Sequence, residues 1–413
     1  MSMSMFSWMS TGPNMVAATD ALCWLCLTVL AGASAMTLFN WRFAARMERR
    51  PSPARVPADD RAVIQPLVQP LVQPLVSLLI PVRNEAENLR SKLAAILQST
   101  YRPLEVIILD DESTDGSYDI AGSILAGAAF PARVVRGSPW SSSSGLSGKA
   151  HACAQLADHA RGEILIFCDA DVISSSLAIQ RTVDWLTVPT GRHRAAGVTA
   201  LPFQSCTGWR ERLLIPWIMH LPLMISVPLF CSWRMPVDSL QMANGQWIAL
   251  FACDYFTSGG HRKLGATPLE DVALARLVRR ATGRGIRPVL AIQDINAAMY
   301  QDWQGMLAGF SKNLVAIGGG NPWYFIFLLF LMNVIFLFPL WGWLVRPDLA
   351  AVGLALCALI RCVTAVSFKL PLRDVLLHPV SLILLNLAGW KSLRHAFGGS
   401  YEWKERVMEW SST

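Results

Sequence analysis

Between about residues 77 and 287, short apolar runs alternate with amphipathic segments. The apolar runs have the length and composition of strands that are buried on both faces: Val76–Val82, Leu104–Leu109, Ala132–Arg136 and Glu163–Cys168. The segments between them carry the periodicity of helices: Glu85–Ser99, Ser117–Ala126 and Gly148–His159. Alternating strands and helices predict an α/β, Rossmann-like domain with a parallel sheet, whose site lies along the edge where the strands end.

A longer apolar run stands near the start of the chain. Residues 21–39 carry no charge, and Arg42, Arg46, Arg49 and Arg50 follow them. A cleaved signal peptide carries its positive charges before the apolar run, so this arrangement predicts a spanning anchor within residues 1–50. The positive-inside rule then predicts an outer N-terminus and a cytoplasmic domain.

The last hundred residues are again apolar. Pro322–Val345 is uncharged, and a second run extends from Leu349 past Arg361 to Phe368. Both are predicted to span the membrane, as parts of a C-terminal region over 315–413. The run Val375–Trp390 is shorter and contains His378-Pro379. Its hydropathy leaves open whether it crosses the bilayer or lies in the interface.

A proline-rich segment over 51–76 separates the anchor from the α/β domain. It contains three tandem copies of Gln-Pro-Leu-Val, beginning at 65, 69 and 73. A proline at every fourth position excludes a helix and favours an extended chain. We therefore interpret 51–76 as a semi-rigid linker to a domain over 77–314.

Composition supports a membrane protein. Of the 413 residues, 53% are hydrophobic and 16% are charged, and the net charge is +7. The basic residues are scattered or lie beside apolar runs, which argues against a nucleic-acid partner and favours anionic lipid headgroups and a phosphorylated substrate. The nine cysteines show no disulfide framework, as expected of reduced thiols in a cytosol-facing protein.

Acidic motifs follow the predicted strands in a particular order. Ile80–Glu85 and Leu109–Ser117 come first, and then Gly148-Lys149-Ala150, Asp169-Ala170-Asp171 and Glu270-Asp271. Together they resemble the glycosyltransferase family 2 domain of GT-A fold. The resemblance implies a UDP-sugar donor and a divalent cation. The leaving diphosphate gains negative charge, which a cation and a lysine stabilise, and carboxylate ligands suit Mg²⁺ or Mn²⁺.

The same resemblance implies a role for each motif. Asp171 is the metal ligand, Asp169 contacts metal or ribose, and Lys149 faces the diphosphate. The other donor-side residues are Pro81, Arg83, Glu85 and Asp111, with Glu85 and Asp111 at the uracil and ribose. Asp271, beside Glu270, matches the catalytic base. Simpler interpretations exist: the Asp169–Asp171 pair could cap a helix, Lys149 could be a solvated surface residue, and the Glu270-Asp271 pair could stabilise a helix N-terminus.

The acceptor side is less defined by the sequence. The Gln-x-x-Arg-Trp motif of processive synthases is absent after Asp271, whereas Ala243–Gln246, Met299-Tyr300, Gly309–Asn313 and Trp403–Arg406 resemble the branch that glycosylates carotenoids and other polyisoprenoid lipids. That branch usually has arginine where Ala298 stands. His261, Trp217 and Lys312 are the acceptor-side candidates, and His261 could instead be structural.

One apolar stretch, Leu213–Ser232, lies between the metal motif and the base. It is long enough to span, but a single crossing would put Asp171 and Asp271 on opposite sides of the membrane. Its three prolines and flanking arginines also oppose a straight span. We expect an interfacial or re-entrant platform for a lipid acceptor, the alternative being a buried pair of helices.

These patterns predict an inverting, metal-dependent hexosyltransferase in the inner membrane that faces the cytoplasm. It would move a hexose, foremost glucose, from a UDP-sugar to a carotenoid or other terpenoid. A polyprenyl phosphate or glycolipid acceptor is one alternative, and an inactive lipid-binding scaffold is another. The sequence leaves the oligomeric state open.

Overall fold

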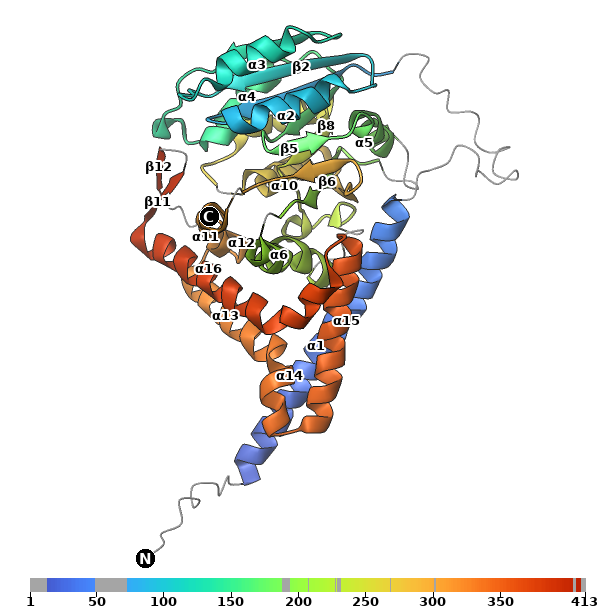
Figure 1. The fold of residues 1–413 in the computed structure, drawn as a ribbon, viewed down its shortest axis with the longest axis vertical. Helices are drawn as coiled ribbons and strands as arrows, with labels where there is room; N and C mark the ends of the chain where they lie inside the picture. Colours follow the sequence, from blue (N-terminus) through green and yellow to red (C-terminus); the bar gives the residue numbers. More distant parts are fainter. Residues whose placement is uncertain are drawn as a thin grey trace, which may run out of the picture.

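The computed structural model of the protein describes residues 13–48, 73–187, 194–206, 208–226, 228, 232–267, 269–300, 302–403 and 406–409. An α/β body stands at one end of a narrower stem of helices (Figure 1). Most of the predicted linker, residues 51–72, lies outside the described part of the chain.

The described strands of the body form a seven-stranded sheet in the order β3-β2-β1-β4-β8-β6-β9. Its strands are β1 (Val76–Val82), β2 (Leu104–Asp110), β3 (Ala132–Arg136), β4 (Ile164–Cys168), β6 (Gly197–Leu201), β8 (Trp247–Phe251) and β9 (Ile286–Leu290). The first four pair in parallel, as predicted. The α/β GT-A-type fold class is confirmed.

The expectation of a wholly parallel sheet is wrong, because β8 runs antiparallel to both β4 and β6. An apolar run identifies a buried strand, but not the direction in which the chain enters the sheet. A small second sheet, in the order β5-β10-β7, lies beside the main one. Its strands are β5 (Val172–Ser174), β7 (Phe203–Gln204) and β10 (Ile295–Ala297).

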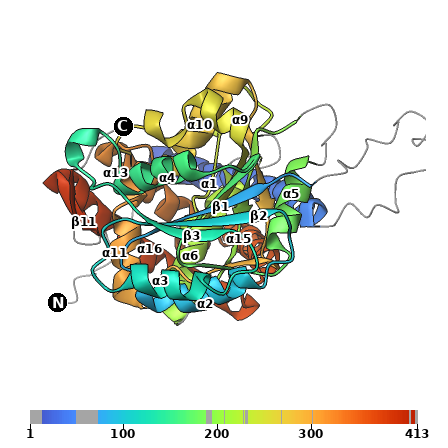
Figure 2. The same ribbon diagram turned by 90° about the horizontal axis from the view of Figure 1, so that it is seen from above.

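Helices cover both faces of the main sheet (Figure 2). On one face, α2 (Ala86–Leu97), α3 (Ser117–Leu125) and α5 (Ala178–Thr187) complete an apolar core with side chains such as Leu89, Ala121 and Ile179. On the other face are α4 (Gly148–His159), α9 (Ala252–Ser258) and α10 (Glu270–Thr282). Burial on both faces explains why these strands read as continuous apolar runs.

The stem contains the candidate membrane helices. Three described helices are long and apolar enough to cross a bilayer: Val16–Phe43 within α1 (Pro13–Glu48), α15 (Pro347–Ser367), and Leu372–Gly398, which ends in α16 (His378–Gly398). Trp24, Phe330 and Val366 are each more than half exposed. Such exposed apolar surface fits contact with lipid.

The region predicted to span the membrane over Pro322–Val345 is bent in the structure, which fits a broken span or a re-entrant loop. Helix α13 (Pro322–Phe336) is followed by α14 (Phe338–Trp341) and a 3₁₀ turn to Leu344, with a bend of 46°. Pro339 supplies no N–H to the preceding turn. Two carbonyls near the bend accept side-chain donors: Val334 O from Trp341 Nε1 at 2.9 Å, and Phe336 O from His378 Nε2 at 2.9 Å.

The Leu213–Ser232 stretch lies where body and stem meet (Figure 1). Its described elements are the end of α6 (Trp209–Ile215), a π-helical turn (Pro216–His220) and α7 (Leu221–Ile225). Helix α1 is fixed to α7 by Asn40, whose Nδ2 donates to the carbonyls of Leu223 and Met224 at 3.1 and 2.9 Å. The described part of the stretch does not qualify as a span.

Helix α16 contacts both parts of the molecule. It packs on α13, and also on α6, α11 (Trp303–Ser311) and α12 (Leu314–Ile317) of the body. Ser392 Oγ accepts a hydrogen bond from the backbone N–H of Val315 at 3.1 Å. The membrane helices therefore hold the body by direct packing.

Candidate active site

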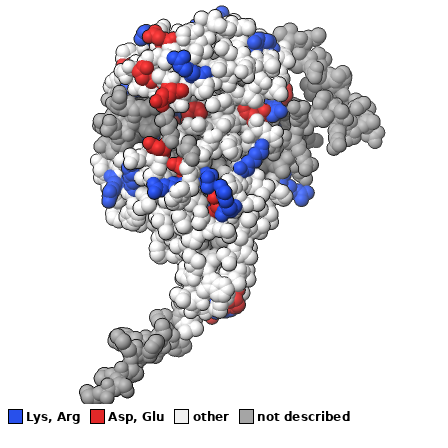
Figure 3. Space-filling view, viewed as in Figure 1, with Lys and Arg blue, Asp and Glu red and all other residues white. Residues whose placement is uncertain are grey.

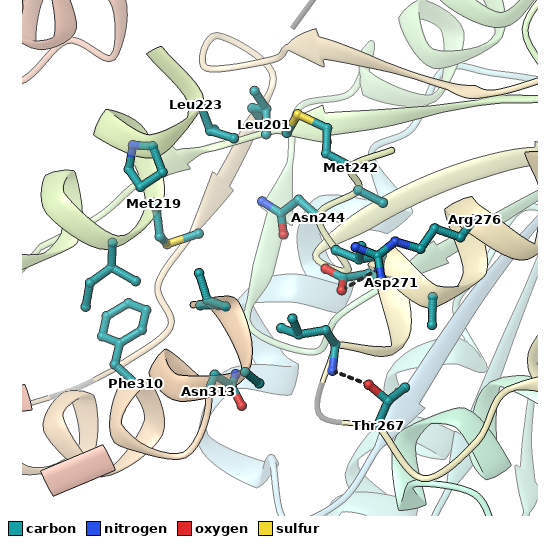
Figure 4. A pocket seen from close by; sticks show the side chains of 18 of the residues that line it. Leu201, Met219, Leu223, Met242, Asn244, Thr267, Asp271, Arg276, Phe310 and Asn313 are labelled. Atoms are coloured by element: carbon teal, nitrogen blue, oxygen red, sulfur yellow. Dashed lines mark hydrogen bonds between the residues drawn. The ribbon is translucent and has the colours of Figure 1, made fainter. Parts of the chain in front are cut away.

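Two cavities meet inside the body. One, of about 550 Å³, lies at the carboxyl ends of β1, β2 and β4; the other, of about 720 Å³, faces the stem. We call them the donor cavity and the apolar cavity. Asp271 and Asn244 line both (Figure 4). The predicted base therefore stands where a compound in one cavity reaches a compound in the other.

Ten of the twelve predicted site residues line the donor cavity: Pro81, Arg83, Glu85, Asp111, Lys149, Asp169, Asp171, Glu270, Asp271 and Lys312. The chain brings them together because parallel strands end at one edge of the sheet. Arg83 Nη1 donates to the carbonyl of Asp111 at 2.7 Å, which links the ends of β1 and β2. The geometry supports one shared site, while the individual roles stay predictions.

A lysine joins the two acidic motifs. Lys149 Nζ lies 2.7 Å from Asp169 Oδ1 and 3.4 Å from Glu270 Oε1. Burial alone would lower the pKa of Lys149, but these two carboxylates raise it well above its usual value. Lys149 stands in the first turn of α4, whose N-cap Ser147 accepts from Ala150 N at 3.2 Å. The ammonium is therefore charged and fixed at the cavity wall.

Asp171 provides an incompletely used oxygen ligand. Its Oδ1 is buried and has no hydrogen-bond partner among the described residues. Burial, together with the neighbouring Asp169, raises the pKa of Asp171 to about 6. No cluster of three or more histidine, cysteine or acidic side chains arranged for a metal occurs in the described part. Two carboxylates nevertheless fit Mg²⁺ or Mn²⁺, since such ions take further ligands from substrate phosphates and water.

Sequence reasoning missed Lys92. This residue belongs to the buried face of α2 with Leu89, Leu93 and Ile96, and it is 1% exposed. Its Nζ donates to the carbonyl of Asp169 and lies 3.4 Å from Cys168 Sγ. A lysine on the apolar face of an amphipathic helix was the available signal. Lys92 supports the backbone that carries the Asp169–Asp171 pair.

Asp271 is held by backbone donors in the first turn of α10. Its Oδ2 accepts from Gly245 N at 2.8 Å and its Oδ1 from Val272 N at 2.8 Å. Burial and the Glu270 charge raise the pKa of Asp271 to about 6. A Cβ at position 245 would lie 2.9 Å from Lys149 Nζ, so a larger residue there would displace the lysine ammonium. Gly245 was quoted as part of a motif but received no role from sequence.

The apolar cavity extends from Asp271 towards the stem. Leu201, Met219, Leu223, Met242 and Phe310 surround it (Figure 4). Its wall also includes Ile317 and Gly319, just before α13, and Phe368, directly after α15. The cavity therefore lies between the reacting carboxylate and the ends of two candidate membrane helices.

Residues 298–300 and 302–313 contribute side chains to both cavities. Met299 and Asn313 line both, while Tyr300 and Lys312 line the donor cavity. Gly309 lies against the ring of Tyr300. A Cβ at position 309 would come 2.4 Å from Cε1 of Tyr300, so the close packing requires glycine. Sequence similarity pointed to this segment, but only Lys312 was named for a site.

Trp217 and His261 are not among the described residues that line either cavity. His261 is buried against Phe167, with ring centroids 4.7 Å apart, and its Nδ1 lies 3.0 Å from Tyr255 Oη. Burial lowers the pKa of His261 to about 3. Trp217 packs edge-on against Phe336. These positions favour structural roles over the predicted contacts with the acceptor, whereas Met219, two residues from Trp217, faces both cavities.

Comparison with known families gives a match over the first part of the body. Residues 77–231 match the family model described as Glycosyl transferase family 2. The matched region contains β1, β2, the Gly148-Lys149 step and the Asp169–Asp171 pair. The expected family is therefore confirmed for this domain.

Curated relatives include 4,4'-diaponeurosporenoate glycosyltransferases of staphylococci. The protein of Staphylococcus haemolyticus (strain JCSC1435) is 24% identical over 258 residues, which cover 61% of this chain and 64% of the relative. That of Staphylococcus aureus (strain bovine RF122 / ET3-1) is 26% identical over 250 residues, covering 59% and 61%. The matched region is thus less than two thirds of each relative's length.

Among solved structures, the mannosyltransferase PcManGT from Pyrobaculum calidifontis, in complex with GDP-Man and Mn²⁺, is 19% identical to this chain. The superposition covers 89% of this chain and 99% of the other, with a TM-score of 0.49.

Proposed function

Because residues 77–231 form a glycosyltransferase family 2 domain, we propose that the whole chain is a membrane-anchored, inverting glycosyltransferase. It moves a hexose, foremost glucose, from a UDP-sugar to a membrane lipid, a carotenoid or another terpenoid. The observation that carries this proposal is that a polar, acid-lined cavity and an apolar cavity meet at Asp271.

The donor cavity suits a nucleotide diphosphate sugar. The N-terminus of α4, with Ser147 and Gly148, lines the cavity, and backbone N–H groups at a helix N-terminus favour phosphate. Lys149 adds a fixed positive charge. Glu85 and Asp111 stand at the ends of β1 and β2, where their oxygens can accept hydrogen bonds from ribose and uracil.

The divalent cation would be held by Asp171, with Asp169 beside it. When bound, it supplies positive charge that stabilises the leaving diphosphate. Mg²⁺ and Mn²⁺ both fit such oxygen ligands. Lys92 and Lys149 hold Asp169 in place, through its carbonyl and its carboxylate respectively.

Asp271 acts as the general base. It takes the proton of an acceptor hydroxyl while the hydroxyl oxygen forms a bond to the anomeric carbon. The bond from that carbon to the diphosphate breaks, UDP leaves on the opposite side, and the configuration inverts. The hydrogen bonds from Gly245 and Val272 orient the carboxylate for this transfer.

The apolar cavity receives the end of the lipid acceptor. Burying each methylene in an apolar phase is worth about 0.8 kcal/mol, so a long isoprenoid does not leave the bilayer for a cytosolic site. The cavity instead extends to the ends of the stem helices, with Met219 and Leu223 of the Leu213–Ser232 stretch on its wall. The lipid can thus stay in the membrane while its reactive end reaches Asp271.

The membrane placement follows from surface charge. On the face shown in Figure 3, Lys and Arg side chains gather on the part of the body next to the stem, whose own charged side chains lie at its far end. Positive residues beside membrane helices favour the cytoplasmic side and anionic headgroups. We place the body on the cytoplasmic face of the inner membrane, with the stem as a multi-pass anchor.

A second acceptor class is favoured by one feature of the apolar cavity. Lys263 and Arg276 line it together with Asp271. Positive charge there suits an anionic acceptor such as a polyprenyl phosphate. Such an oxygen is already deprotonated, so Asp271 would matter less for its transfer.

The proposed function is tested by mass spectrometry of lipid extracts from cells with and without the gene. We expect lipids heavier by one hexose in the expressing cells only, with an isoprenoid aglycone. Extracts that are identical would contradict the proposal, and a phosphorylated aglycone would favour the second acceptor class.

The rate should depend on pH through Asp271. Only the carboxylate can take a proton, so we expect turnover to fall as the pH drops through about 6, the raised pKa of this group. The assay contains saturating Mn²⁺, which keeps Asp171 deprotonated, so that the fall in rate reports the protonation of Asp271 alone. A rate that stays constant down to pH 5, about one unit below that pKa, would contradict the assignment.

The apolar cavity can be blocked without touching the donor cavity. Leu223 lines only the apolar cavity among the described contacts. Leu223→Trp should lower transfer to the lipid by about tenfold or more, the effect of about 1.4 kcal/mol of lost binding. UDP-sugar hydrolysis without acceptor should not change.

Leu177→Trp is the matched control for this variant. Leu177 is exposed before α5 and lines neither cavity in the described structure. It should leave both activities intact. Equal loss of transfer and hydrolysis in Leu223→Trp would exclude the apolar cavity as the acceptor route.

A further inference from the structure

A buried arginine lies in a membrane helix, outside both cavities. Arg361 belongs to α15, six residues before the helix ends at Ser367 beside the body, and it is 5% exposed. Charged side chains within membrane helices are costly and commonly mark functional sites. Arg361 therefore needs a partner that neutralises it.

Asp374 is the carboxylate whose charge acts on Arg361, and it already forms an ion pair with Arg212. Asp374 accepts from Arg212 Nε at 2.9 Å and from Arg212 Nη2 at 3.5 Å. Asp374 is itself 5% exposed. Arg361 is therefore buried beside a carboxylate that already pairs with Arg212, on which the charge of Glu211 also acts.

Several nitrogen atoms around Arg361 lack partners. In the part of the chain that the structure describes, Nε and Nη1 of Arg361, Nε1 of Trp217, and Nδ1 of His220 and His378 are buried without a hydrogen bond. The guanidinium stands 5.6 Å from the centre of the Trp217 ring, and that ring lies 5.3 Å from His378. Burial and the Arg361 charge lower the pKa of His220 to about 3.

These unpartnered nitrogen atoms indicate which kind of ligand the site would bind. Arg361 and the Trp217 N–H can only donate hydrogen bonds, whereas His378 Nδ1 is an acceptor, because Nε2 of the same ring donates to Phe336 O. Donors therefore outnumber acceptors around the positive charge of Arg361. A phosphate group supplies several acceptor oxygens and negative charge, and it matches the arginine fork. Water would satisfy the donors but would leave the charge uncompensated.

The site lies at the height of lipid headgroups. Lys369 and Arg373 are exposed in the turn that follows α15. Leu372 and Leu376, in the same turn, are 54% and 84% exposed. Basic residues beside exposed leucines mark the region where an anionic lipid meets the protein.

We propose that Arg361 and the N–H of Trp217, beside His220, bind a phosphate group, supplied by the headgroup of an anionic phospholipid. This rests on the membrane placement under the proposed function. His220 stacks on Phe368 with ring centroids 4.0 Å apart, and both line the apolar cavity. The bound phosphate therefore stabilises one wall of the acceptor route.

The test uses the full chain purified in detergent and native mass spectrometry. Phosphatidylglycerol, diacylglycerol with the same acyl chains, and inorganic phosphate are the three probes. The variants are Arg361→Gln and the control Arg373→Gln, which removes an exposed charge from the neighbouring turn. Arg361→Lys keeps the positive charge but lacks the paired N–H donors of the guanidinium. It replaces Arg361→Gln in the test if that variant does not give a monodisperse protein.

We expect the wild type to retain phosphatidylglycerol at least about tenfold better than diacylglycerol, since charged hydrogen bonds are the strong ones. Arg361→Gln should lose this preference, Arg361→Lys should keep part of it, and Arg373→Gln should behave as wild type. Equal retention by wild type and Arg361→Gln would overturn the site. Displacement of phosphatidylglycerol by millimolar inorganic phosphate would show that the site binds free phosphate and not a lipid headgroup. No sugar transfer is measured, so failure here leaves the proposed function standing.

Discussion

Asp271→Asn should lower turnover by roughly 10²–10⁴, the usual worth of a general base, while UDP binding stays near wild type. Asparagine keeps the shape of the side chain and can still accept from Gly245 N, but it cannot take a proton. Steady-state transfer and UDP affinity, measured on the same preparation, separate these effects. The pH limb near 6 should disappear with the carboxylate.

Asp158→Asn is the control for the loss of one carboxylate. Asp158 is an exposed partner of Arg262 outside both cavities in the described structure, and its variant should keep full turnover. A variant of Asp271 that loses UDP affinity instead would place this residue in the donor site. A fall of less than about tenfold would favour an acceptor that is already anionic.

Asp171→Asn should remove metal-dependent transfer almost completely. A catalytic cation stabilises the transition state by several kcal/mol, and each 1.4 kcal/mol corresponds to about a tenfold change in rate. We therefore expect a fall of roughly 10³ or more. Excess chelator should reduce the wild type to the level of the variant. Mn²⁺ uptake in the presence of UDP, followed by electron paramagnetic resonance, gives a readout that does not depend on turnover.

Asp184→Asn provides the matched control for Asp171. Asp184 accepts from Gln180 on α5 and does not line the described cavities. Its variant should bind Mn²⁺ and turn over as wild type does. Full turnover of the wild type in excess chelator would contradict the metal assignment for Asp169 and Asp171.

Much of the donor half follows from the sequence. The predicted strand Ala132–Arg136 and helix Gly148–His159 agree with β3 and α4 in both bounds. Asp111 and Asp169 directly follow apolar strands, and parallel pairing brings such strand ends to one edge. Ten of the residues that line the donor cavity could therefore be named from the sequence and its family resemblance.

The acceptor half depends on packing that the local pattern does not contain. Trp217 and Met219 stand two residues apart in one apolar run, and only the packing of the π-helical turn decides which of them faces the cavity. His261 reads as a candidate ligand in sequence, whereas its contact with Phe167 buries it. Side-chain direction in an irregular segment is set by tertiary contacts.

The sequence by itself determined the α/β class, the donor-side acids and the apolar anchors, since strand and helix periods and motif spacing are properties of neighbouring residues. The tertiary structure decided the antiparallel direction of β8, the break before Pro339, and the ion pair between Lys149 and Glu270. It also decided that the apolar cavity ends at Asp271. Each of these depends on which distant segments meet, and a buried apolar residue can be satisfied by many different partners.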